Sequence, residues 1–556
     1  MAKGGRLLAA AAAMIAMLTV QAALSPLSAA ADQGGPVVQT SEGSVQGFVR
    51  NGVGTFLGIP YAAPPVGALR WQPPQPHTAW AQTLHATKFA NTCPQITELG
   101  VFAGPVSVTE DCLYLNVFAP RTNAPNAKKL PVLVWLHGGG LFDGESNDYD
   151  PTALVKGGPA GPTVVVTINY RLGLLGYLGH PVLDAEGHDF GNYGLMDQQA
   201  ALHWVQRNIA AFGGDPGNVT VGGQSAGSTS TAALVISPRS AGLLHRAIFQ
   251  SGPLLTVAPL DVAEQRGTKF AAAAGCGEEV NGAAANCLRA LSIDKILSLQ
   301  GTAAANGPHV TGLMVDGKVL PIAGDTAWTT GQFNHMPIMN GGVADEGAFA
   351  ASINELFFGT ISAERYETLV KGTFGGPAGP SLGPPNYPEG TPAAVLAKYP
   401  LSAYRTPGDA WTAVGSDANV CRHPYLNSRV SQLVPLYAYE FRYRNAPWYF
   451  PAISFAHGAA HTVDIQFLFA DWHGGPLGIP HKLSPQEQVL ARQLITAWTN
   501  FMYTGNPNLK GNSPWPRYTK GSEVYLVQDV PQPTTVTEAQ FRKAHQCDFW
   551  DTVLVY

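Results

Sequence analysis

One serine of the sequence lies in a pattern that could make it a nucleophile. Residues 223–227 read Gly-Gln-Ser-Ala-Gly and fit Gly-x-Ser-x-Gly, with Ser225 at the centre. Such a serine occupies a very tight turn between a strand and a helix, where a Cβ two residues before or after it would collide. The pattern alone is weak, because 62 of the 556 residues are glycine. Its context fits, since a strand is predicted at 219–221 and a helix at 226–235.

A second glycine-rich segment could supply what a serine nucleophile lacks. A serine hydroxyl needs a base, and the negative charge that develops on the substrate oxygen needs hydrogen-bond donors. His-Gly-Gly-Gly at 137–140 directly follows an apolar run at 132–136. We expect the backbone N–H groups of Gly138, Gly139 and Ala226 to hold this oxygen, since glycines allow close approach. An ordinary glycine-rich turn is the less favoured alternative.

The elements that must position these residues alternate between strands and helices. Continuous apolar runs at 132–136 and 164–168 are typical of strands covered on both faces. Helical spacing follows at 197–212, where a Gly-Gly-Asp-Pro segment ends the pattern, and a late helix is predicted at 486–502. This alternation predicts an α/β fold with a mainly parallel sheet and helices on both faces. Residues 374–388 are rich in Gly and Pro and predict an irregular surface segment.

Composition and the N-terminus narrow the class of protein. The chain is 45% hydrophobic and 13% charged, which suits a large globular protein, and its formal net charge of -5 argues against nucleic-acid binding. Residues 1–31 resemble a secretory signal peptide: Lys3 and Arg6 precede an apolar run at 7–24, and small residues follow at 28–31. A membrane anchor is the alternative, but the run is marginally short for a span. We therefore expect an exported protein, secreted or periplasmic, without a stable membrane anchor, whose remaining residues 32–556 form a single domain.

Six cysteines agree with export, because an even number in an exported chain suggests disulfides. Their spacing by itself allows 15 pairings. No Cys-x-x-Cys pair is present, so the spacing typical of a zinc site is missing. The six residues are Cys93, Cys112, Cys276, Cys287, Cys421 and Cys547.

Several further segments resemble, in one order, the signatures of a single family. Gly-Ile-Pro-Tyr-Ala at 58–62 and Glu-Asp-Cys-Leu-Tyr-Leu-Asn-Val at 110–117 resemble its two N-terminal signatures. Asn-Tyr-Arg at 169–171 and Phe-Gly-Gly-Asp-Pro at 212–216 continue the match up to the serine. The chain thus resembles the type-B carboxylesterases, which include the cholinesterases, over nearly its whole mature length. The resemblance implies an α/β-hydrolase fold: a large, mostly parallel central sheet flanked by helices, with insertions that form an active-site gorge. It implies no cofactor and no metal.

The resemblance also assigns the partners of Ser225. Asp-Glu-Gly at 345–347 resembles the segment that holds the acid, which implies that role for Glu346. The segment 460–469 resembles the one that holds the base, which implies that role for His461; His457 is the nearby alternative. Two positions depart from the family, because Thr462 stands where glycine is usual and Asp464 where glutamate is usual.

Further roles follow from the resemblance alone. It implies three disulfides, Cys93 with Cys112, Cys276 with Cys287, and Cys421 with Cys547. Ser251 matches a buried serine near the triad, and we expect it to form a hydrogen bond there. Arg70 and Glu110 match a buried ion pair.

These assignments predict a secreted serine carboxylesterase that works through an acyl-enzyme intermediate on a small-molecule ester. Gln224 replaces the glutamate of cholinesterases and no Trp lies between 93 and 112, which disfavours choline esters. We expect small to medium or bulky aromatic esters, although core packing is the alternative for any single aromatic residue. The expected pocket residues are Leu141, Phe142, Gln224, Phe349 and Trp448.

Alternative functions would either use the same three residues, Ser225, Glu346 and His461, or not depend on them. A lipase or polyester hydrolase would share the triad and prefer long or insoluble substrates. A peptidase stays open, because attack on an amide uses the same groups. A non-catalytic adhesion protein is a remote alternative, since such proteins typically lose the serine. The sequence leaves the physiological ester and the oligomeric state open.

Overall fold

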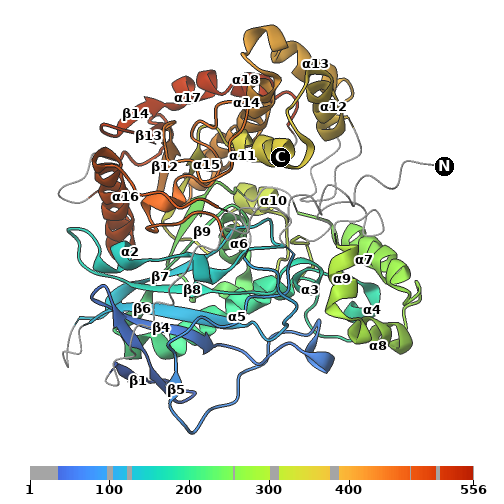
Figure 1. Cartoon of the computed structure of the whole chain (residues 1–556), viewed down its shortest axis with the longest axis vertical. Coiled ribbons are helices and arrows are strands. Elements are labelled where there is room, and N and C mark those ends of the chain that lie inside the picture. The colour runs from blue at the N-terminus through green and yellow to red at the C-terminus, as the bar shows by residue number, and fades with distance from the viewer. Residues whose placement is uncertain are drawn as a thin grey trace, which may run out of the picture. The chain divides into compact units, whose positions relative to one another are not determined.

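The apolar runs of the sequence pair into one large sheet (Figure 1). The computed structural model describes residues 35–96, 104–121, 128–253, 257–300, 312–375, 387–475, 478–508 and 514–554. Within these residues an 11-stranded sheet has the order β14-β13-β12-β11-β10-β9-β7-β8-β6-β4-β3. Neighbouring strands from β13 to β8 run parallel, and antiparallel pairs close both edges. The prediction of a large, mostly parallel sheet is confirmed.

The strands of this sheet are, in its order, β14 (Thr534–Thr537), β13 (Val524–Gln528), β12 (Leu436–Phe441), β11 (Ile338–Val343), β10 (Arg246–Gln250), β9 (Gly214–Gln224), β7 (Leu130–Leu136), β8 (Val164–Ile168), β6 (Tyr114–Pro120), β4 (Val53–Pro60) and β3 (Phe48–Arg50). A smaller sheet joins β1 (Val37–Gln39), β2 (Ser44–Gln46) and β5 (Leu84–His85).

The helices are α2 (Thr152–Lys156), α3 (Gly173–Gly176), α4 (Pro181–Asp184), α5 (Tyr193–Asn208), α6 (Ala226–Ile236), α7 (Leu260–Ala274), α8 (Gly282–Ala290), α9 (Ile293–Leu299), α10 (Gly324–Thr330), α11 (Gly347–Phe358), α12 (Ala363–Phe374), α13 (Thr391–Lys398), α14 (Pro407–Val420), α15 (Arg422–Val430), α16 (Pro485–Thr504), α17 (Glu538–Ala544) and α18 (Cys547–Trp550).

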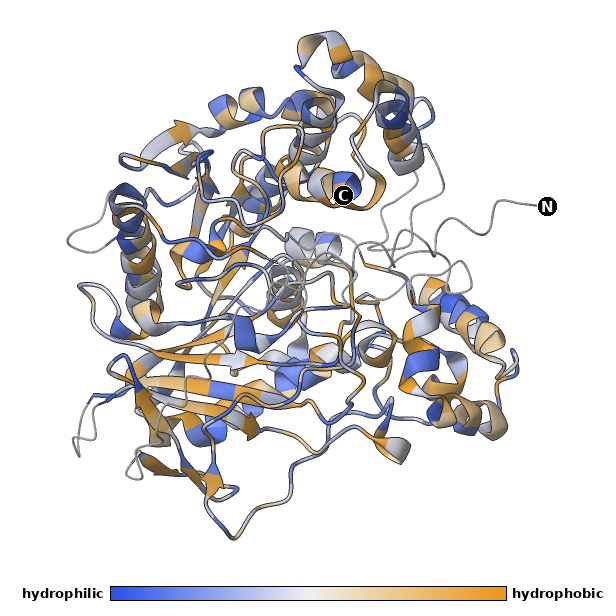
Figure 2. Ribbon diagram, viewed as in Figure 1, coloured by the Kyte–Doolittle hydropathy of each residue, from blue (hydrophilic) through white to orange (hydrophobic). Residues whose placement is uncertain are grey.

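Strand β7 shows why its run is apolar at every position. Val132, Val134 and Leu136 belong to an apolar core shared with α5 and α6. The alternate residues Leu133 and Trp135 belong to a second core shared with α16. Successive side chains of a strand point to opposite faces, so a strand with helices on both sides buries all of them. Orange apolar strands lie between these layers in Figure 2, and the predicted helices on both faces are confirmed.

Helix boundaries differ from the predictions by a few residues. The helix predicted at 197–212 is α5, which begins earlier, at Tyr193, and continues after Asn208 as a 3-10 turn to Phe212. Gly213 then ends it with a left-handed φ of 86°, which glycine adopts without strain. The strand predicted at 219–221 is longer, since β9 pairs with β7 at Gly214 and from Val219 to Gly223, and with β10 from Thr220 to Gln224.

A group of helices after β11 forms a separate apolar core. Residues of α12, α13, α14 and α18 share it, and the disulfide between Cys421 and Cys547 lies within it (Figure 1). Residues 376–386 of the predicted irregular segment lie outside the described residues, as does the predicted signal peptide. The active-site gorge formed by insertions stays a prediction.

All three implied disulfides are present: Cys93–Cys112, Cys276–Cys287 and Cys421–Cys547. The implied ion pair is present too, since the Arg70 guanidinium donates to both carboxylate oxygens of Glu110, at 2.7 and 2.6 Å. In the part of the chain that the structure describes, no helix has the length and apolar character needed to cross a membrane.

Candidate active site

Ser225 occupies the sharp turn that the glycine pattern predicts. It follows β9 and directly precedes α6, with φ 57° and ψ -123°. A Cβ on Gly223 would lie 2.4 Å from the backbone carbon of Gly227, and one on Gly227 would lie 2.0 Å from the carbonyl oxygen of Leu136. Neither position can therefore carry a side chain. The Ser225 N–H donates to the Gln250 carbonyl at 2.9 Å, which ties the turn to β10.

The glycine-rich segment after β7 packs against this turn. A Cβ on Gly227 would also meet the carbonyl oxygen of His137, at 2.7 Å. Gly139 and Gly140 have positive φ angles of 103° and 62°. Among the described residues no acceptor takes the N–H of Gly139, whereas the N–H of Gly138 interacts with the Tyr149 hydroxyl. The N–H of Ala226 begins α6, where no intrahelical acceptor exists. The free N–H groups of Gly139 and Ala226 thus flank Ser225.

Glu346 follows β11 and is buried, with 8% of its surface exposed. One carboxylate oxygen accepts the Val343 N–H at 3.0 Å, and the other accepts from Nδ1 of His461. Burial raises the pKa of Glu346. This effect is outweighed by the charge and hydrogen bond of His461, with smaller contributions from the Ser251 hydroxyl and the Val343 N–H, so the pKa lies below its usual value. Glu346 is therefore a carboxylate at neutral pH and fixes the proton of His461 on Nδ1.

His461 reaches Glu346 because the loops that carry them are joined. Asp345 and Ala460, which directly precede Glu346 and His461, form a parallel bridge. The Asp345 N–H donates to the Ala459 carbonyl at 3.0 Å. The Asp345 carboxylate also accepts the Ala459 N–H at 2.8 Å and a two-armed hydrogen bond from Arg444, at 2.8 and 3.0 Å. His457, the alternative base, stacks on Trp448 and bonds to the Gly458 carbonyl instead.

The sequence matches a known family and several known proteins over most of its length. The model of the carboxylesterase family matches residues 34–550. The chain is 31% identical to the medium-chain fatty acyl-CoA hydrolase precursor of Anas platyrhynchos over 549 residues, which cover 93% of this chain and 92% of the relative. It is 33% identical to carboxylesterase 1C of Rattus norvegicus over 543 residues, 93% of each chain. It is 34% identical to the fumonisin B1 esterase of Sphingopyxis macrogoltabida over 511 residues, 90% of this chain and 87% of the relative.

The chain belongs to the carboxylesterase family. It is a carboxylic ester hydrolase with the α/β-hydrolase fold, as the sequence predicted. In this carboxylesterase the predicted pocket residues lie in two groups. Leu141 and Phe142 are buried in the loop after β7, where the Phe142 ring covers Gly140. Gln224 and Phe349 lie at His461.

A chain of packed aromatic rings extends from His461 in the carboxylesterase. The Phe349 ring lies 5.7 Å from the His461 imidazole, and Phe450 packs edge-on against Phe349 at 5.4 Å. Trp448 then stacks on Phe450 at 5.1 Å. The rings of Phe450 and Phe349 thus connect Trp448 to His461. Phe450 lies between two of the predicted pocket residues, Phe349 and Trp448.

Two buried groups, Ser251 and Asp464, interact electrostatically with Glu346. The Ser251 hydroxyl is among the groups that lower the pKa of Glu346, but its oxygen forms no hydrogen bond of normal geometry in the described part of the chain. The hydrogen bond predicted for Ser251 stays a prediction. Asp464 accepts from the Gln250 side chain at 2.6 Å, and burial raises the pKa of its carboxyl to about 7.

Sequence reasoning missed the residues that hold the loops together. Asp345 and Arg444 carry no local signal, because they are 99 residues apart and their pairing depends on the fold. Among the described residues, no group of three or more His, Cys, Asp or Glu side chains could hold a metal ion.

Proposed function

We propose that this carboxylesterase hydrolyses its substrate through a triad of Ser225, His461 and Glu346, and that it is secreted. The observation that carries the proposal is the hydrogen bond from His461 Nδ1 to the buried Glu346 carboxylate, at the turn that presents Ser225. Nδ1 holds the proton, so the other ring nitrogen, Nε2, has the lone pair that a base needs.

The reaction would proceed in two halves. Nε2 of His461 takes the proton from Ser225 Oγ as this oxygen attacks the ester carbonyl carbon. The N–H groups of Gly138, Gly139 and Ala226 hold the oxyanion of the tetrahedral intermediate. Collapse breaks the bond to the alcohol oxygen, which leaves with the proton from His461. Water then loses a proton to His461, attacks the acyl-enzyme, and releases the acid and the free Ser225 hydroxyl.

The substrate class rests on the aromatic groups beside the base. Phe349 and Phe450 offer flat apolar surfaces next to His461, which suit small to medium or bulky aromatic esters. The relatives are named for a fatty acyl-CoA, for fumonisin B1 and for carboxylic esters in general, so their names support ester-type chemistry without choosing one acyl group. A lipase or polyester hydrolase with the same triad is the alternative.

Secretion is supported by the three disulfides, which form and persist in oxidising compartments. The signal peptide at 1–31 belongs to the same proposal, and N-terminal sequencing of the exported protein would test it. A mature protein that retains Met1 would contradict it.

Hydrolysis of p-nitrophenyl esters by the purified protein and by a Ser225→Ala variant tests the triad. We expect the variant to lose three orders of magnitude or more in kcat, because the acyl-enzyme cannot form. A series of acyl chain lengths then separates the two substrate classes: a maximum at short chains supports the esterase, and a rise with chain length and with insolubility favours the lipase. A folded Ser225→Ala variant as active as the parent would refute the triad.

A further inference from the structure

The side chain that precedes the nucleophile contacts the base directly. Gln224 is the last residue of β9 and is fully buried, and its side-chain Nε2 lies 3.1 Å from Nε2 of His461. Its other polar atom, Oε1, is buried and has no hydrogen-bond partner among the described residues. A buried amide therefore faces the nitrogen that must accept the Ser225 proton.

The protonation of His461 decides which end of the amide suits it. Glu346 accepts from Nδ1, so in the neutral imidazole Nε2 carries a lone pair and is an acceptor. The Gln224 N–H group is a donor and matches it. Once Nε2 has taken the Ser225 proton it becomes a donor, and a half-turn of the amide about its last side-chain bond brings Oε1 to it as an acceptor.

We propose that Gln224 is a positioning residue that serves both protonation states of His461: it donates to the neutral imidazole at rest and accepts from the imidazolium during the reaction. This inference rests on the proposed triad. In the resting enzyme the amide competes with the Ser225 hydroxyl for one lone pair, which keeps the imidazole in place without a substrate. In the tetrahedral intermediate it adds a hydrogen bond to a charged group, and such bonds are stronger than neutral ones.

An amide can do both, because it carries a donor and an acceptor. A glutamate at this position would accept from the imidazolium and add a negative charge, whereas a methionine of similar shape cannot donate and accepts only weakly. The matching residue of the next strand behaves differently: Gln250, the register partner of Gln224 on β10, donates to Asp464. Among the described residues, Glu346 and Asp464 are titratable groups that interact electrostatically with His461, and Phe349 packs against it with an uncharged ring.

Two variants of Gln224 separate these roles. We expect Gln224→Met to lower kcat about 10- to 100-fold with KM within about twofold, because a hydrogen bond to a charged group is lost in the transition state and not in the bound substrate. We expect Gln224→Glu to move the acid limb of the pH profile of kcat/KM to higher pH by about one unit, because a nearby carboxylate favours the protonated imidazole.

A matched control keeps the test specific. Gln199 on α5 is buried as well, and its side chain bonds to Ser237 and Ser240, away from His461. Gln199→Met should lower the melting temperature but leave kcat and the pH profile unchanged. A Gln224→Met enzyme with the parent kcat, or a Gln224→Glu profile that superimposes on that of the parent, overturns the inference.

A readout without turnover distinguishes this inference from the proposed function. Histidine labelled with 13C in the ring allows the His461 resonance to be titrated by NMR, with assignment by its loss in His461→Gln. A higher titration midpoint in Gln224→Glu than in the parent supports the contact even if p-nitrophenyl esters are not hydrolysed, in which case the proposed function alone fails. Identical midpoints refute the contact whatever the activity.

Discussion

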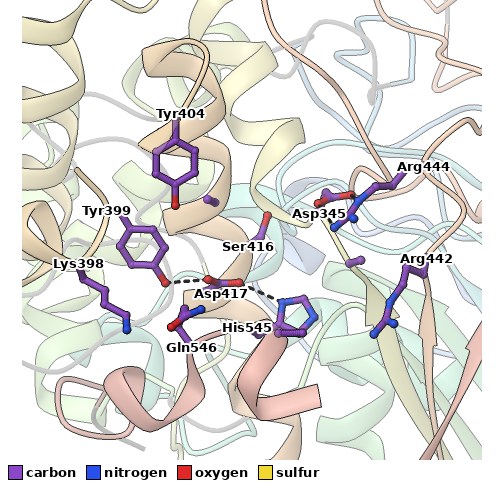
Figure 3. Close-up of a pocket in the computed structure, with 13 residues that line it drawn as sticks. Asp345, Lys398, Tyr399, Tyr404, Ser416, Asp417, Arg442, Arg444, His545 and Gln546 are labelled. Carbon is purple, nitrogen blue, oxygen red and sulfur yellow. Dashed lines mark hydrogen bonds and ion pairs between the residues drawn. The ribbon is translucent and has the colours of Figure 1, made fainter. Parts of the chain in front are cut away.

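The partly buried His461 and the buried His545 both bond to carboxylates in this carboxylesterase, and they differ in what their second nitrogen meets. His461 donates to Glu346 through Nδ1, while its Nε2 faces the uncharged amide of Gln224. His545, which follows α17, has carboxylates on both sides: Asp417 lies 3.0 Å from Nδ1 and Glu440 lies 2.5 Å from Nε2. Figure 3 shows Asp417 between His545 and Tyr399, at a cavity of about 500 Å³.

The difference teaches what leaves a histidine able to act as a base. Burial lowers the pKa of His545, but the two carboxylates raise it by more than burial lowers it, and the pKa is about 9. His545 is therefore an imidazolium at neutral pH, and neither ring nitrogen has a lone pair that could accept a proton. The pKa of Glu440 is lowered correspondingly by His545 and Arg442. His461 has one carboxylate partner, and its second nitrogen faces an uncharged amide.

A third histidine completes the comparison. His423 interacts electrostatically with one carboxylate from each site, Glu346 and Glu440. Burial lowers its pKa to about 4, and Nδ1 lies 3.3 Å from the side-chain oxygen of Asn340. Burial thus keeps His423 neutral where no carboxylate contacts its ring, whereas two direct carboxylate contacts charge His545.

The largest expected effect separates the two histidine sites by activity. His461→Gln should lower kcat by three to four orders of magnitude, because the base is lost. His545→Gln should keep kcat within about threefold, since His545 contacts Asp417 and Glu440 and not the triad. Steady-state hydrolysis of a p-nitrophenyl ester measures both. If both variants fold and lose kcat to a similar extent, the two histidines do not differ in their importance for catalysis.

The next effect concerns stability against pH. The pKa of His545 rises from 6.5 to about 9 on folding, which corresponds to about 3 kcal/mol of stabilisation at most. Because the folded value is the higher one, this contribution is complete below pH 6.5 and is lost as pH rises through about 9. Urea unfolding at pH 6, 7, 8 and 9.5 measures it.

The control is His545→Gln, in which this pH-dependent part should be missing. The difference in unfolding free energy between parent and variant should therefore shrink between pH 7 and 9.5. A difference that stays constant over this range would contradict the buried imidazolium.

The smallest expected effect lies next to the base. Thr462 is buried, has a positive φ of 82°, and its hydroxyl bonds to that of Tyr449. A β-branched residue in this region is strained, whereas glycine is not. Thr462→Val should therefore destabilise the protein by about 1–3 kcal/mol, because the strain stays and the Tyr449 hydroxyl loses its partner.

Thr462→Gly should change stability by no more than about 1 kcal/mol, since relief of strain offsets the lost hydrogen bond. Thermal unfolding of the two variants ranks them. A glycine variant less stable than the valine variant would show that Thr462 is not strained in the folded protein.

The sequence by itself determined the features that depend on neighbouring residues. The glycines around Ser225 predicted the turn, because a steric collision within five residues decides it. The apolar run of β7 predicted a strand with both faces covered, because every one of its side chains had to be buried. Resemblance to the family supplied the more distant assignments, including Glu346, His461 and the three disulfides, without a geometric reason.

Only the tertiary structure decided how distant groups meet. Glu346 and His461 are 115 residues apart, and the bridge at Asp345 with the Arg444 contact aligns their loops. The same holds for the contact of Gln224 with His461 and for the enclosure of His545 by Asp417 and Glu440. The physical reason is that the protonation of a histidine depends on burial and on charges a few Å away, and these arise when separate segments pack together.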